Sequence, residues 1–86
     1  MPNWTIKIVR KAEKALENFP AKDQRMMLVA FDAMTINSFF GDLKHLHNQK
    51  ASWRRRAGRY RIFFDIYPDL LLVDIVEINR RTSKTY

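Results

Sequence analysis

Arginine and lysine residues are concentrated in the second half of this chain of 86 residues. Residues 44–86 hold ten Lys or Arg and four Asp or Glu, a net charge of +6, whereas residues 1–43 hold six and five, a net charge of +1. A positive field confined to one half indicates a polyanionic partner. The planar fork of arginine can grip two phosphate oxygens at once. The composition therefore favours binding of a phosphate-rich polymer, foremost RNA, over a merely solvated basic surface.

Strands in this half must position the arginines. Three are predicted, at residues 53–57, 60–67 and 70–79. They are separated by two turns, Gly58-Arg59 and Pro68-Asp69. Gly58 can adopt the positive φ that a two-residue hairpin turn requires. These segments therefore predict three consecutive antiparallel strands.

The first half of the chain has a different periodicity. Residues 4–9 alternate as a short strand, and residues 10–19 and 21–36 carry the apolar stripes of two helices separated by Pro20. Residues 39–52 are expected to be irregular. This order predicts an α+β fold in a single domain over residues 1–86, with a two-helix hairpin packed on one face of a small sheet.

The two turns fix a register. The first turn places Ala57 opposite Tyr60, Arg56 opposite Arg61 and Arg54 opposite Phe63. The second turn predicts Arg61 opposite Val76 and Asp65 opposite Leu72. One face of the sheet should then carry Arg54, Arg56, Arg61 and Arg80, offset in part by Asp65 and Asp74. The other, apolar face should carry Tyr60, Ile62, Phe64, Ile66, Leu71, Val73 and Ile75.

Three aromatic or charged residues on the apolar face need a role. Arg55 falls there, where it is expected to lie at the sheet edge and reach solvent. Trp53 and Tyr60 could stack on nucleobases as in single-strand binders, but the alternation favours core packing for both.

Several classes of protein and site are disfavoured. The chain contains no cysteine, so it has neither a disulfide nor a thiolate site. We see no secretion signal and no stretch long enough to span a membrane, so a cytoplasmic protein is expected. His45 and His47 have no nearby acidic ligands, so no metal site and no cofactor are predicted.

Two segments of the second half match a known family. Residues 53–61, Trp-Arg-Arg-Arg-Ala-Gly-Arg-Tyr-Arg, resemble the aromatic-Arg-x-Arg-x-Gly-x-Tyr-Arg strand pair of RelE/ParE-type toxins from bacterial type II toxin–antitoxin systems. Residues 76–80 followed by Tyr86 resemble the final strand, arginine and C-terminal tyrosine of that family. The predicted strand and helical hairpin at the N-terminus fit the same topology.

The resemblance implies two activities on one fold. RelE-like members are metal-independent endoribonucleases that cut messenger RNA in the ribosome, and ParE-like members inhibit DNA gyrase. The arginine set with Tyr86 favours the messenger RNA endoribonuclease, which inhibits translation. A gyrase inhibitor and a non-catalytic RNA-binding module remain as alternatives. Both toxin interpretations predict a cognate antitoxin encoded by an adjacent gene, besides the messenger RNA and ribosomal RNA partners of the nuclease.

Metal-free RNA cleavage needs a base for the 2′-hydroxyl, charge stabilisation at phosphorus and an acid for the leaving oxygen. Arg61 and Arg80 are the candidates for charge stabilisation, and Tyr86 is the resemblance-based candidate for proton transfer or stacking. The predicted RNA-binding residues are Arg54, Arg56, Arg81 and Lys84. Arginine stays protonated and is a poor base, so His45 and His47 are the candidates for a general base on the ground of their ordinary pKa.

Overall fold

The computed structural model describes residues 4–36, 43–45 and 51–80, with residues 43–45 described by their backbone only. Its two helices are α1 (Arg10–Glu17) and α2 (Ala21–Ile36), and α2 has the predicted bounds. The break between them is stabilised by Gln24, whose Nε2 donates to the carbonyl of Phe19 at 2.9 Å. None of the described helices is long and apolar enough to cross a membrane.

Five strands form one mixed sheet in the order β1-β5-β4-β3-β2. Their bounds are β1 (Thr5–Ile8), β2 (Leu43–His45), β3 (Trp53–Ala57), β4 (Tyr60–Tyr67) and β5 (Leu72–Arg80). The three predicted C-terminal strands are antiparallel neighbours as expected. β1 lies parallel to β5, with Thr5 opposite Leu72. β2 lies within the segment predicted to be irregular, and it pairs antiparallel with β3.

The β3–β4 hairpin has the predicted register. Ala57 pairs with Tyr60, Arg56 with Arg61 and Arg54 with Phe63. Gly58 has φ 59°, and a Cβ on this residue would lie 2.7 Å from the sulfur of Met26. The left-handed backbone therefore favours glycine at the turn, whereas the end of the flexible Met26 side chain could move aside.

The β4–β5 register differs from the prediction. Arg61 pairs with Asn79 rather than Val76, and Asp65 pairs with Asp74 rather than Leu72. One cause is the connection, a 3₁₀ turn over Pro68–Leu70 followed by Leu71 in the left-handed conformation (φ 49°). Leu71 is therefore outside β5 and 36% exposed, so its predicted place on the apolar face was wrong.

A β-bulge is the second cause of the shift. Phe63 pairs with Glu77 while Phe64 pairs with Ile75, so Val76 is an extra residue on β5. Beyond such an extra residue, side chains that would have pointed to one face of the sheet point to the other face. Val73 and Ile75 are buried before the bulge, and Ile78 is buried after it.

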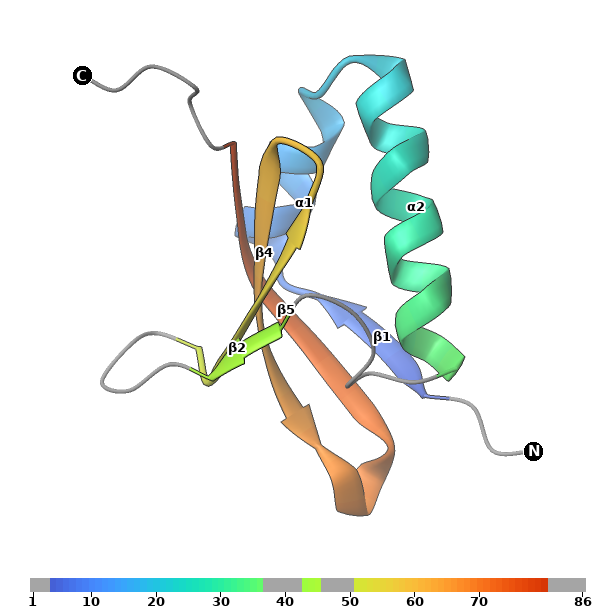
Figure 1. The fold of residues 1–86 in the computed structure, drawn as a ribbon, viewed down its shortest axis with the longest axis vertical. Helices are drawn as coiled ribbons and strands as arrows, with labels where there is room; N and C mark the ends of the chain where they lie inside the picture. Colours follow the sequence, from blue (N-terminus) through green and yellow to red (C-terminus); the bar gives the residue numbers. More distant parts are fainter. Residues whose placement is uncertain (1–3, 37–42, 46–50, 81–86) are drawn as a thin grey trace.

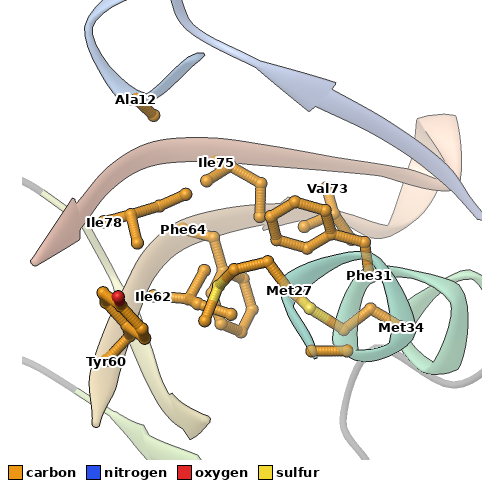
Figure 2. Packing of buried hydrophobic residues seen from close by; sticks show 11 residues of the cluster. Ala12, Met27, Phe31, Met34, Tyr60, Ile62, Phe64, Val73, Ile75 and Ile78 are labelled. Atoms are coloured by element: carbon orange, nitrogen blue, oxygen red, sulfur yellow. The ribbon is translucent and has the colours of Figure 1, made fainter. Parts of the chain in front are cut away.

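The core lies between the helices and one face of the sheet, as predicted for this α+β arrangement. Figure 2 shows side chains of α2 meeting those of β4 and β5, and Figure 1 shows α2 lying along the sheet. Each of the largest core side chains is less than 2% exposed, and those on the sheet occupy the predicted apolar face. This group is Met27, Met34, Tyr60, Ile62, Phe64, Val73 and Ile75.

Candidate nucleic-acid interface

The face of β3 and β4 that points away from the core carries three arginines, Arg54, Arg56 and Arg61. Their cross-strand partners establish this, since paired residues share a face and none of the three is opposite a core residue. Arg56 is exposed, and Arg54 and Arg61 are half-buried. We call these three residues the arginine face. The prediction that the hairpin brings them together is confirmed.

The cations of the arginine face repel one another. Arg56 is directly opposite Arg61, and like charges in that position destabilise an antiparallel pair. Within the described part of the chain, neither Arg54 nor Arg61 has a carboxylate within 4.0 Å. A bound anion would relieve this repulsion, and the arginine fork fits two phosphate oxygens. The arrangement is therefore suited to a polyanion.

Phe63 lies within the arginine face, a role that was not predicted for it. It is opposite Arg54 on one side and Glu77 on the other, and it is half-buried. An aromatic ring beside cations can stack on a nucleobase. The alternation of side chains along β4 was the available signal. Because Phe64 points into the core, its neighbour Phe63 must point to the opposite face of the sheet.

Carboxylates border the arginine face on the β5 side. Glu77 accepts hydrogen bonds from the Lys11 Nζ at 3.2 Å and from the Asn79 Nδ2 at 2.6 Å. Farther along the sheet, Asp65 pairs with Asp74, so the two share a face as predicted. Asp65 is fixed there by the backbone N–H of Ser52, which donates to its Oδ1 at 2.8 Å. Negative charges thus limit how far a polyanion can extend across the sheet.

Arg80 does not join the arginine face. It pairs with Tyr60 at the end of β5, so it lies on the face that carries the core, where it is exposed. The prediction that it shares a face with Arg61 was wrong, because the bulge at Val76 reverses the alternation of β5. To reach the arginine face, its side chain must pass around the end of the strand.

Arg55 lies on the core face, opposite Ile62, as the alternation predicted. It does not reach solvent, since it is only 8% exposed, and that part of the prediction was wrong. Removal of the guanidinium from water lowers its pKa below the ordinary value of an arginine. The side chain therefore belongs to the interior of the hairpin rather than to the interface.

Tyr60 connects the hairpin to the helices. The side chain is 1% exposed, stacks on Phe19 with ring centroids 4.3 Å apart, and donates a hydrogen bond of 2.5 Å to Asp23 Oδ2. Burial raises the pKa of the Tyr60 hydroxyl above 10.0, the Asp23 bond and charge raise it further, and Arg80 and Arg59 partly offset this. Trp53 also packs against the core. Core packing, the favoured role for both rings, is confirmed.

The raised pKa of Tyr60 predicts a loss of stability in alkali. Because the folded state holds the hydroxyl proton more tightly, its contribution is full below the unfolded value near 10.0 and declines as the pH rises through the higher folded value. Tyr60→Phe should cost about 1 kcal/mol at neutral pH. It should also flatten the decline in unfolding free energy above about pH 10. Urea unfolding at each pH measures both effects, and equal alkaline slopes in the two proteins would contradict the assignment.

The remaining predicted residues lie mostly outside the described part of the chain: His47, Arg81, Lys84 and Tyr86. His45 is the last residue of β2, and the backbone register pairs it with Trp53. Among residues 4–36, 43–45 and 51–80, no group of three His, Cys, Asp or Glu is arranged to hold a metal ion.

Comparison with solved structures identifies the fold. The chain superposes with a TM-score of 0.80 on the archaeal RelE of a RelE–RelB complex from Pyrococcus horikoshii OT3, at 21% identity, covering 98% of this chain and all of that one. The chain has the RelE fold. The toxin–antitoxin complex RelBE2 from Mycobacterium tuberculosis also gives 0.80, at 20% identity and 94% coverage of both chains. The isolated RelE toxin of E. coli gives 0.70, at 8% identity, covering 94% of this chain and 87% of that one.

No family model matches the sequence, and no curated protein matches it either. The similarity to these solved structures is therefore mainly one of backbone geometry. Within this RelE fold, the arginine face lies on the side of the sheet opposite the helices, and the hairpin turn at Gly58 sets its register.

Proposed function

We propose that this chain is the toxin of a type II toxin–antitoxin pair and a metal-independent endoribonuclease that cleaves messenger RNA on the ribosome. The observation that carries the proposal is the arginine face, three cations gathered on the sheet surface that the helices leave uncovered. The RelE fold supports it, because solved structures of that fold are described as toxins and toxin–antitoxin complexes.

The proposed reaction uses the substrate's own nucleophile. The 2′-oxygen attacks the adjacent phosphorus as its proton passes to a base, and the bond from phosphorus to the 5′-oxygen breaks as an acid protonates that oxygen. The products are a 2′,3′-cyclic phosphate and a 5′-hydroxyl. Arg61 would stabilise the charge that grows on the phosphoryl oxygens, while Arg54 and Arg56 would hold the flanking backbone.

Proton transfer is assigned to residues beyond the arginine face. Tyr86 is the proposed acid, and His45 and His47 are the candidates for the base. Neighbouring cations favour the ionised form of a tyrosine and so assist transfer. Arg80, Arg81 and Lys84 would add positive charge along the path of the RNA, within the cytoplasm.

The proposed partner is an antitoxin encoded beside this gene. Toxin–antitoxin complexes of the RelE fold have been solved from four organisms. An acidic or amphipathic chain would complement the excess of basic residues in the second half of this one. Co-expression of the neighbouring open reading frame should restore growth.

Induction in bacteria tests the activity. We expect growth to stop and new 5′ ends with a free hydroxyl to appear within codons of translated messages. Mapping of 5′-hydroxyl ends measures this, with an untranslated copy of the same message as the control. Growth arrest with intact transcripts would exclude the nuclease, and arrest with DNA breaks would instead assign gyrase inhibition.

A further inference from the structure

Helix α2 exposes an apolar stripe on the side opposite its buried residues. Leu28, Val29 and Ile36 are 54%, 69% and 73% exposed. They follow a helical spacing of seven to eight residues, so they lie on one side of the helix. Figure 1 shows that this helix flanks the sheet and has no described element on its outer side. Large apolar side chains gathered on one surface indicate an interaction site.

Two opposite charges lie on the same stripe. Arg25 and Asp32 are both exposed and are separated by seven residues, two helical turns. Neither side chain forms an ion pair within the described residues. The stripe therefore presents the Arg25 cation and the Asp32 anion, with Leu28 and Val29 between them. Lys22, which is also exposed and lies two turns before Val29, adds a second cation near the start of the helix.

The order of these residues is self-complementary. We propose that α2 forms a symmetric dimer with a second copy of this chain, the two helices packing antiparallel about a two-fold axis between Leu28 and Val29. In this arrangement Leu28 is level with the partner's Val29, and Arg25 is level with the partner's Asp32. Ala21 is level with the partner's Ile36, a small residue against a large one. A two-fold axis repeats each contact, so the dimer contains two Arg–Asp pairs.

The charges on the stripe favour a second copy of this chain over a polyanionic or polycationic partner. A polyanion would meet Asp32, and a polycation would meet Arg25, in the middle of the stripe. A matching surface needs an anion and a cation two turns apart with apolar residues between them, and α2 in the reverse direction supplies that order. The arginine face lies on the other side of the sheet, so both copies keep it accessible.

Charge reversal tests the pairing. Sedimentation velocity of the full chain at about 0.15 M salt, where the Debye length is about 8 Å, should show a dimer that forms with rising concentration. Arg25→Asp and Asp32→Arg should each weaken the dimer at least about tenfold, because each places like charges together twice. The double variant Arg25→Asp/Asp32→Arg should restore it.

Controls separate pairing from net charge and from folding. The two single reversals change the net charge in opposite directions, so a charge effect would move the affinities oppositely. Lys14→Asp on the exposed side of α1 makes the same change as Arg25→Asp and should leave the dimer intact. Thermal unfolding should be similar in all variants. A monomer at every concentration, or a dimer that survives both single reversals, would overturn the proposal.

Cross-linking tests the direction of the helices. Because the chain has no cysteine, Arg25→Cys and Asp32→Cys each create one thiol. A short bis-maleimide should join a mixture of the two variants more efficiently than either variant alone. Equal cross-linking of Arg25→Cys with itself would indicate parallel helices and would also overturn the proposal.

Discussion

Arg61→Ala should lower the rate of RNA cleavage by about 100- to 1,000-fold, the usual effect of removing a group that stabilises transition-state charge. Arg61 is the arginine on β4 that faces Arg56 and lies near Phe63 on the same face, so it is central on the arginine face. Its removal also relieves the repulsion with Arg56. The free energy of unfolding should therefore stay within about 0.5 kcal/mol of the original.

Single-turnover cleavage on programmed ribosomes measures the rate, and urea unfolding measures the stability. Arg10→Ala is the matched control, because it removes an exposed arginine from α1 and should leave cleavage unchanged. Arg80→Ala should have a smaller effect than Arg61→Ala, since Arg80 lies on the opposite face of the sheet. Full activity in Arg61→Ala would remove this residue from the mechanism.

Phe64→Ala should destabilise the fold by about 3–5 kcal/mol, the range for removing a buried aromatic side chain. Phe64 is fully buried and pairs with Trp53 and Ile75 at the bulge. Because domains of this size are stable by only about 5–15 kcal/mol, the variant should unfold at much lower urea concentration. Circular dichroism during urea titration measures the midpoint.

The neighbouring residue provides a matched comparison for Phe64→Ala. Phe63→Ala removes the same side chain from the opposite face and should cost about 1 kcal/mol or less. It should weaken binding of single-stranded RNA about tenfold, in line with the loss of one stacked base. A large loss of stability in Phe63→Ala, with RNA affinity unchanged, would show that Phe63 is a packing residue and not a stacking platform.

The elements that could be predicted from the sequence are those whose signals lie in a few neighbouring residues. The bounds of α2 follow from its apolar period, and the β3–β4 register follows from Gly58 in a two-residue turn. That register alone places Arg54, Arg56 and Arg61 on one face of the hairpin. The short strand β2 lacked such a signal, since three residues are too few to establish an alternation.

The end of β5 could not be predicted from neighbouring residues, because the bulge at Val76 changes the face on which the later side chains lie. Val76 follows Ile75 and adds a second apolar residue in a row, a pattern that fits either a bulge or a slightly longer strand. The choice depends on packing against β4, which a single-sequence pattern does not contain. One extra residue was enough to transfer Arg80 to the other face of the sheet.

The parallel pairing of β1 with β5 has a consequence for the timing of synthesis. Thr5 and Leu72 are neighbours in the sheet although they are far apart in the chain, and such long-range contacts form late. During translation, β1 lacks the strand with which it pairs until β5 has left the ribosome. The nascent chain should therefore remain incompletely folded until late in its own translation.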